Sequence, residues 1–146
     1  MAEAIGYSKS LRLSNIFPGR QANGFSITTL GGDPSAGQIS VYGFWDENSV
    51  DYPSKLALIN LEVYNQTDLY PRSNITINIS AYLPKRNQEI KVKRLTAPGA
   101  DVMSGDLTTW AGQTFNSGVA EGSIIEETIS DGEVVLEASS AALVYW

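Results

Sequence analysis

The most regular pattern in the chain is an alternation of side chains over residues 55–64, Lys-Leu-Ala-Leu-Ile-Asn-Leu-Glu-Val-Tyr. Successive side chains of an extended strand point to opposite faces. One face of this stretch is therefore mixed, and the other is wholly apolar, formed by Ala57, Ile59, Leu61 and Val63. Such a strand is typical of the centre of a sheet that is packed against another layer. We expect residues 55–64 to form a central strand.

Shorter stretches with alternating or β-branched residues recur along the rest of the chain, separated by Gly, Pro, Asn and Asp. Ile75, Ile77 and Ile79 oppose Asn74 and Asn78 in one of them. The expected strands are 11–17, 25–30, 38–45, 55–64, 74–82, 89–95, 123–129, 133–138 and 141–146, with the turn 130–132 joining two of them. No stretch has a helical period, so the pattern predicts an all-β fold, an antiparallel β-sandwich of about eight or nine strands.

The first residues are the one exception to this pattern. Residues 1–6, Met-Ala-Glu-Ala-Ile-Gly, combine helix formers with a glycine at the position of a left-handed cap. They read as the last turn of a helix whose beginning is missing. We therefore expect residues 1–6 to be the end of a helix from another domain, and residues 7–146 to form a single sandwich domain.

Composition narrows the range of functions. The 146 residues contain no cysteine and no histidine, which excludes disulfides, thiolate metal sites and histidine-based acid–base catalysis. The net charge of −6 argues against nucleic acid as a partner. No apolar run is long enough to span a membrane, and the start Met-Ala-Glu-Ala does not resemble a signal peptide.

Three glycosylation sequons lie close together, beginning at Asn65, Asn74 and Asn78. Asn74 and Asn78 fall on the face of their strand that opposes the isoleucines, so both side chains are expected to point to solvent. A plain polar outer face is the alternative interpretation of the same residues. The glycosylated interpretation implies a secreted parent protein, because sequons are used only in the secretory pathway.

The acidic residues do not form an evident catalytic pair. A glycosidase needs two carboxylates about 5 to 10 Å apart across a cleft. Glu126 and Glu127 are neighbours in an expected strand and face opposite sides, while the pairs Asp46/Glu47 and Asp101/Asp106 lie in loops where acids form turns. Loop carboxylates have no EF-hand spacing either, so we assign no catalytic residue, no metal and no cofactor.

The tryptophans and one long loop are the remaining candidates. Trp146 ends an alternating strand and is expected to pack on the core, whereas Trp110 follows a long irregular segment, residues 96–106, and is the best candidate for an exposed role. A loop of this length in a compact domain is functional or docked on a neighbour, and we favour docking. The rival hypotheses are an independent carbohydrate-binding module, with Trp110 and Tyr42 or Trp45 as stacking platforms, and an adhesion domain without a ligand.

A family resemblance supports the docked interpretation. The runs 94–101, Arg-Leu-Thr-Ala-Pro-Gly-Ala-Asp, and 109–115, Thr-Trp-Ala-Gly-Gln-Thr-Phe, with the closing strand 138–144, resemble the C-terminal β-domain of fungal glycoside hydrolase family 79. That family contains β-glucuronidases and relatives of heparanase. Residues 56–61 are similar to the family's strand that ends in Ile-Asn-Leu, and residues 1–6 to the end of the barrel's last helix.

The resemblance implies a role beside a catalytic domain. In such enzymes a (β/α)8 barrel supplies two glutamates for retaining hydrolysis, and neither can be carried over to a position in this sequence. The implied partners are therefore that barrel and a glucuronide-containing saccharide, and the implied location of the parent enzyme is extracellular. Residues expected at the barrel contact or the rim of the cleft are Asp101, Trp110, Gln113 and Phe115. Trp110 or Phe115 is expected to belong to an exposed apolar patch.

Overall fold

The computed structural model describes residues 11–15, 26–30, 38–46, 51–85 and 88–146. These residues form ten strands and two short 3₁₀ helices. The strands are β1 (Leu11–Asn15), β2 (Ser26–Leu30), β3 (Ile39–Asp46), β4 (Lys55–Asn60), β5 (Asn74–Asn78), β6 (Ile90–Thr96), β7 (Thr109–Trp110), β8 (Glu127–Ile129), β9 (Glu133–Glu137) and β10 (Ser140–Tyr145). The helices are η2 (Ser80–Tyr82) and η3 (Gly105–Leu107).

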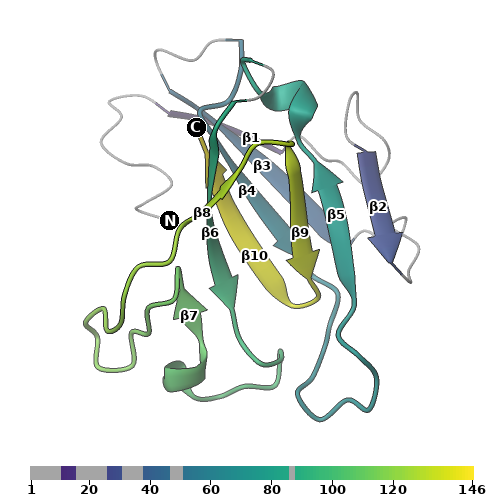
Figure 1. Ribbon diagram of the computed structural model, residues 1–146. Coiled ribbons are helices and arrows are strands. Elements are labelled where there is room, and N and C mark those ends of the chain that lie inside the picture. Colours follow the sequence, from purple (N-terminus) through teal and green to yellow (C-terminus); the bar gives the residue numbers. More distant parts are fainter. Residues whose placement is uncertain (1–10, 16–25, 31–37, 47–50, 86–87) are drawn as a thin grey trace.

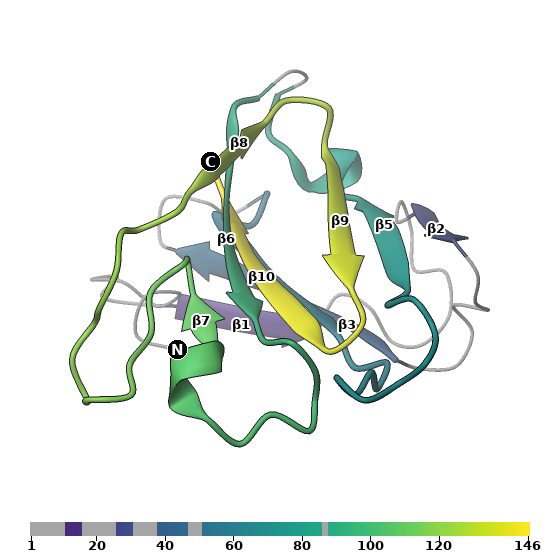
Figure 2. The ribbon, with the colours of Figure 1, turned by 60° about the horizontal axis from the view of Figure 1, so that its bottom comes forward.

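The strands form two sheets in which every pairing is antiparallel. A seven-stranded sheet has the order β1-β3-β4-β10-β6-β7, with β8 also paired to β6. A three-stranded sheet has the order β2-β5-β9 and lies across it (Figures 1 and 2). The all-β sandwich is confirmed, and the short β7 adds a strand to the predicted set. β4 lies inside the larger sheet, as expected for a central strand.

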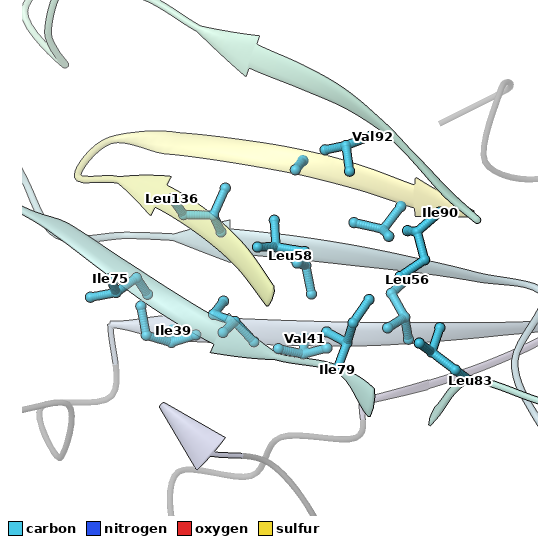
Figure 3. Close-up of a cluster of buried hydrophobic side chains, with 14 residues drawn as sticks. Ile39, Val41, Leu56, Leu58, Ile75, Ile79, Leu83, Ile90, Val92 and Leu136 are labelled. Atoms are coloured by element: carbon cyan, nitrogen blue, oxygen red, sulfur yellow. The ribbon is translucent and has the colours of Figure 1, made fainter. Parts of the chain in front are cut away.

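The core lies between the two sheets. Leu56 and Leu58 of β4 belong to one buried cluster with Ile75 and Leu136 of the smaller sheet, in which Leu58 lies beside Leu136 (Figure 3). Trp146 packs against this cluster from its edge, as predicted. The mixed row of β4 therefore faces the core, and the wholly apolar row faces outward. Removing these aliphatic side chains from water provides the main stabilisation of the sandwich.

Two strands end earlier in the structure than the alternation of apolar and polar residues in the sequence predicts. β4 ends at Asn60, whose Oδ1 accepts a 3.0 Å hydrogen bond from the Glu62 N–H. β5 ends at Asn78, whose Oδ1 accepts a 3.0 Å hydrogen bond from the Ser80 N–H, and η2 follows. In each case the asparagine amide binds the backbone two residues further on, which competes with continued strand pairing.

The end of the chain passes repeatedly between the sheets. The predicted turn at residues 130–132 is present, with Gly132 at φ +74°. It does not join two paired strands, however, because β8 pairs with β6 and β9 pairs with β5. The next turn contains Ser139 at φ +53° and returns the chain to the larger sheet as β10. The expected strand 123–129 is also shorter, because only β8 is paired.

The expected helix remnant at residues 1–6 lies outside the described residues, so this prediction and the domain division that depends on it remain predictions. No helix in the described part of the chain is long and apolar enough to cross a membrane. Across the same residues, no group of three or more His, Cys, Asp or Glu side chains could hold a metal ion.

Candidate functional site

The outer face of the seven-stranded sheet carries an apolar row that crosses four strands. Ile59 of β4 pairs with Ala141 of β10, which pairs with Leu95 of β6. Leu95 in turn pairs with Trp110 of β7. Residues directly opposite each other in paired strands share a face of the sheet, so these four side chains form one continuous row. Ile59, Ala141 and Trp110 are half-buried, and Leu95 is 41% exposed.

A second row of side chains on the same face is less exposed than the first and ends at a lysine. It runs from Tyr42 through Ala57 and Leu143 to Lys93. Leu143 is only 4% exposed, although it lies on the face opposite the core cluster. The accessible apolar part of the outer face is therefore the row from Ile59 to Trp110, near the loop end of the sandwich.

A shallow groove of about 430 Å³ continues this row into the loops. Its lining includes Ile59, Leu61, Val63, Leu95 and Val102. Leu61 and Val63 are the two members of the expected apolar row of β4 that lie beyond the end of the strand. They remain on the surface, with Val63 69% exposed. Among the described residues that line the groove, none carries a charge and none is aromatic.

The loops around the groove are held together by Arg72. Its Nε donates to the Ala138 carbonyl at 2.8 Å, and its two terminal nitrogens donate to the carbonyls of Ala97 at 2.9 Å and Ser139 at 3.2 Å. Nη1 also lies 3.0 Å from a Glu137 carboxylate oxygen. A single guanidinium thus joins the loop before β5, the segment after β6 and the turn between β9 and β10.

Asp101 belongs to the same network of loops. Its Oδ1 accepts a 2.8 Å hydrogen bond from the Gln66 N–H, and the neighbouring Ala100 N–H donates to the Tyr64 carbonyl at 2.7 Å. Gly99 is buried at this contact, and a Cβ there would lie 2.3 Å from the Gln66 nitrogen. Asp101 therefore fixes one loop against another.

Trp110 and Gln113 lie at the base of an arm formed by residues 111–126, which extends from the body of the sandwich (Figures 1 and 2). The two residues exchange backbone hydrogen bonds of 2.9 Å across a tight turn in which Ala111 and Gly112 have positive φ. The Gln113 side chain donates to the Gly122 carbonyl at 2.9 Å. The structure thus brings Trp110 and Gln113 together, and holds Asp101 in a different loop.

Phe115 lies further along the arm and is 47% exposed. The arm is closed by two 2.9 Å backbone hydrogen bonds between Thr114 and Glu121, and by a hydrogen bond from the Ser117 hydroxyl to the Glu121 carboxylate. Val119 is 67% exposed. The arm therefore presents Phe115 and Val119 to solvent, and the place of Phe115 in an apolar contact surface stays a prediction.

The far end of the outer face is charged but locally balanced. Lys91 Nζ lies 2.8 Å from Glu89 Oε1, and this contact lowers the pKa of Glu89 below its ordinary value. Lys93 lies over the Tyr145 ring, 5.8 Å from its centroid. Burial raises the pKa of Tyr145, whose hydroxyl donates to Glu126. Because each charge has a partner of opposite sign or an aromatic ring, this end offers no strong field for a polyanion.

Glu126 and Glu127, neighbours in sequence, are bonded to different partners. Glu127 accepts a bidentate pair of hydrogen bonds from Arg94, at 2.6 and 2.8 Å, and this contact lowers the pKa of Glu127. Glu126 instead binds Tyr145. The two neighbours point to different partners, as expected from strand alternation, and Glu47 lies outside the described residues.

The three aromatic residues proposed as sugar platforms are not grouped. Tyr42 and Trp110 share the outer face, but β4, β10 and β6 lie between their strands, which separates them by roughly 19 Å at the usual strand spacing. Trp45 lies two residues after Gly43 on the same face of β3, and its ring covers that glycine. They cannot form a common stacking surface for one short saccharide.

Two of the three predicted sequons, at Asn74 and Asn78, lie on the other sheet from the groove, whereas Asn65 lies in the loop beside the groove residues Val63 and Gly99. Asn74 and Asn78 are half-buried on the outer side of β5, the central strand of the smaller sheet, while Ile75 and Ile77 point into the core. Asn65 lies in the loop before β5, where its N–H donates to Asp68 Oδ2 at 2.8 Å. The outer side of the smaller sheet thus carries the sequons at Asn74 and Asn78, and the outer side of the larger sheet carries the apolar row.

Sequence reasoning missed Arg72 and Leu95. An arginine in a loop gives no signal by itself, because its partners here are carbonyls of segments distant in sequence. Leu95 did give a signal in the sequence. It alternates with Lys91 and Lys93 and so lies on the same face of β6, where an apolar residue among lysines is unexpected. A search for such residues would have located the apolar row.

The described residues form a two-sheet antiparallel β-sandwich with an apolar row and a groove on the outer side of its larger sheet. The sequence profile of the glycosyl hydrolase family 79 C-terminal β-domain matches residues 41–143. The chain belongs to this family of domains.

A solved structure is also similar to the chain. It is the crystal structure of a 4-O-α-L-rhamnosyl-β-D-glucuronidase from Fusarium oxysporum in complex with Rha-GlcA. The two are 27% identical with a TM-score of 0.57, over 82% of this chain. This chain spans only 26% of the length of that enzyme chain. A search of curated proteins found no match.

Proposed function

We propose that the chain is the non-catalytic C-terminal β-domain of a secreted family 79 glycoside hydrolase of β-glucuronidase type, and that it supports the enzyme's (β/α)8 catalytic barrel. The observation that carries the proposal is the apolar row from Ile59 to Trp110 on the outer face of the larger sheet. An exposed apolar face on a sheet whose other face already packs a core is typical of a surface that covers a neighbouring domain.

The arm and the loop that carries Asp101 are proposed to approach the edge of the catalytic cleft. Support comes from the exposed side chains of Phe115 and Val119 on an arm whose own backbone is fully paired at its base. Both lie on the arm that begins directly after Trp110, the last residue of the apolar row. A saccharide with a glucuronide unit would then reach this domain at the rim of the cleft.

Passage through the secretory pathway is part of the same proposal. Its support is the position of Asn74 and Asn78 on the polar sheet, where a glycan would leave the apolar row uncovered. The parent protein would be a glycoprotein in which glycans and barrel occupy opposite sides of the sandwich.

The test compares two arginine substitutions in the parent enzyme, which joins this chain to its catalytic domain. Ile59→Arg places a charge in the apolar row, and Thr76→Arg places the same charge at another half-buried β-branched residue on the polar sheet. A charge buried without a partner at an interface costs several kcal/mol. We expect Ile59→Arg to lower the temperature of half-inactivation by about 5 °C or more, and Thr76→Arg to change it by about 1 °C.

The outcome separates the hypotheses clearly. Equal effects of the two substitutions, or no effect of Ile59→Arg, would remove the support for docking through this face. Titration of the isolated chain with glucuronide-containing oligosaccharides provides a second comparison. A saturable change in tryptophan fluorescence would indicate a carbohydrate-binding module instead.

A further inference from the structure

The groove at the loop end has the properties of a preformed receptor for an apolar segment. Its walls come from three separate parts of the chain, namely the residues after β4, the residues after β6 and the turn before β10. Leu61 and Val63 remain on its surface although aliphatic side chains gain free energy from burial. The segments that carry them are nevertheless fixed by several hydrogen bonds.

Fixing these loop segments in one conformation costs conformational entropy. Holding one loop residue in a single backbone conformation costs about 1 to 2 kcal/mol. Here the cost is offset by polar contacts of Arg72, Asp101 and Ser139, whose hydroxyl donates to the Glu62 carbonyl at 2.9 Å and accepts from the Tyr64 N–H at 2.9 Å. These groups all bind backbone atoms beneath the groove and leave its apolar side chains uncovered. Because this surface is already ordered, binding a partner does not require further loss of its conformational entropy.

Arg72 occupies the key position among these contacts. Its guanidinium bonds three carbonyls and one carboxylate, and its Cζ lies 5.5 Å from the centre of the Tyr64 ring. Only the planar fork of arginine can reach these acceptors at once, because a lysine ammonium is a single point of donation. Arg72 thus holds the segment around Ala97 to the turn before β10, in addition to the contacts of Ala100 and Asp101 with the loop after β4.

We propose that the groove receives an uncharged apolar segment of the catalytic domain, and that Arg72 is the positioning residue that keeps the groove in its binding shape. The inference rests on the proposed function, which supplies the partner. The occupant is argued from the lining, which in the described residues lacks charges and aromatic rings. It is also argued from the solved relative, in which about three quarters of the chain lies outside the part that this chain matches.

A saccharide is a poorer occupant of the same space. Sugar sites combine stacking rings with convergent polar groups, and the described lining of this groove has no aromatic ring. Ser139 and Ser140 in the lining bind backbone carbonyls, and Thr96 binds the Thr109 hydroxyl. Among the buried polar side-chain atoms of the described lining, only Nδ2 of Asn60 has no hydrogen-bond partner.

A second copy of the chain could offer the exposed Phe115 and Val119 of its arm, but only at the concentration of the free protein. A catalytic domain in the same polypeptide is favoured as the occupant, because the covalent link raises its effective concentration at the groove.

The first test places a carboxylate in the groove of the parent enzyme. Val63→Asp is compared with Val135→Asp, because Val135 is 45% exposed on the outer side of the smaller sheet and serves as the matched control. We expect Val63→Asp to lower the temperature of half-inactivation by about 5 °C, and to increase hydrogen exchange in residues 59–66 at least tenfold. Val135→Asp should change neither quantity.

The second test separates positioning by Arg72 from general stability. Arg72→Lys is compared with Arg94→Lys, because Arg94 makes a similar fork with Glu127 at another edge of the sandwich. Both substitutions should lower the unfolding temperature of the sandwich. Only Arg72→Lys should accelerate hydrogen exchange at Ala100 and Gln66 and loosen the catalytic domain, seen as faster proteolysis between the domains.

The results can also overturn the inference without touching the proposed function. If Ile59→Arg destabilises the enzyme but Val63→Asp does not, docking through the sheet stands and the groove has no occupant. If Arg94→Lys loosens the domains as much as Arg72→Lys, the effect is one of stability alone. Competition by a glucuronide-containing oligosaccharide for the groove, detected as protection of residues 59–66, would replace the apolar segment with a sugar.

Discussion

At the scale of single residues, paired charges determine how the sandwich responds to acid. Arg94 holds Glu127 through two short hydrogen bonds and donates a third to the Val135 carbonyl at 2.5 Å. The contact therefore joins β6 of the larger sheet both to β8 and to β9 of the smaller sheet. It closes the edge of the sandwich where the two sheets meet.

We predict that Glu127→Gln removes part of the acid sensitivity of the fold. The pKa of Glu127 is lower in the folded protein than in the unfolded chain, because Arg94 stabilises the carboxylate. The stabilisation is therefore present above the ordinary glutamate pKa of about 4.3, and is lost as the pH falls through the lower folded value. The Glu127 side chain is 41% exposed, so solvent screening limits the contribution to roughly 1 kcal/mol.

The measurement is the free energy of urea unfolding at about pH 7 and about pH 3 for both proteins. Wild-type protein should lose more stability between the two pH values than Glu127→Gln by roughly 1 kcal/mol. Identical losses would show that other groups account for the acid sensitivity.

At the scale of secondary-structure elements, the arm offers a test of local steric fit. Gly112 has φ +78°, and a Cβ at this position would lie 2.7 Å from two carbons of Ile125. Gly118 has nearly the same backbone, φ +80°, and no atom would lie within 4 Å of an added Cβ. The two glycines differ in their neighbours while sharing the left-handed conformation that other residues rarely adopt.

We predict that Gly118→Ala costs about 1 kcal/mol, the conformational penalty alone, and that Gly112→Ala costs more, because the Ile125 side chain must move aside and the Ser123 carbonyl oxygen lies 3.1 Å from the added Cβ. The extra cost should appear as faster hydrogen exchange of the Ile125 amide, which donates to the Ala111 carbonyl at 2.7 Å. The double variant Gly112→Ala/Ile125→Ala should recover part of the loss. Equal costs for the two glycines would contradict the assigned contact.

The elements also show how far the sequence alone could lead. Alternation placed Ile75 and Ile77 of β5 opposite Asn74 and Asn78, and these isoleucines are buried in the core, because a residue's face depends only on its own strand. It overextended β4 and β5, because the amides of Asn60 and Asn78 divert the backbone by a contact that alternation does not contain. The turn at residues 130–132 was found, but turn residues determine local backbone shape and do not indicate which sheet the next strand will join.

The candidate site was less predictable for the same reason. Trp110, Gln113 and Phe115 were singled out as neighbours in sequence, and they do lie along one arm. The groove is assembled from segments that are far apart in sequence, so its members could be recognised only once β4, β10 and β6 had been placed side by side. Arg72 shows the limit most clearly, because its hydrogen-bonded partners are backbone carbonyls, which have no sequence signature.

At the scale of the whole molecule, the two outer faces differ in chemistry. The larger sheet exposes the apolar row and its groove, and the smaller one exposes Asn74, Thr76 and Asn78. This division predicts that modification and docking do not compete. It also explains why a pattern of sequons on one strand is compatible with an extensive domain contact.

We predict that expression of the parent enzyme through a secretory pathway adds glycans at Asn74 or Asn78. Endoglycosidase treatment should increase electrophoretic mobility, and Asn74→Gln and Asn78→Gln should each remove the part of the shift that belongs to its site. Removing the glycans should leave the temperature of half-inactivation within about 1 °C, because neither site lies on the apolar row. Absence of any shift would favour the plain polar interpretation of this face.

The position of β10 has a consequence for synthesis of the protein. This strand lies between β4 and β6 in the larger sheet, yet it follows all the other described strands in the chain. Until the ribosome has translated as far as Tyr145, β4 and β6 each have an open edge, and such edges invite pairing with other chains. A premature stop codon after Ser139 would therefore leave a hole in the middle of the sheet, where the nascent chain is most vulnerable to aggregation and to quality control.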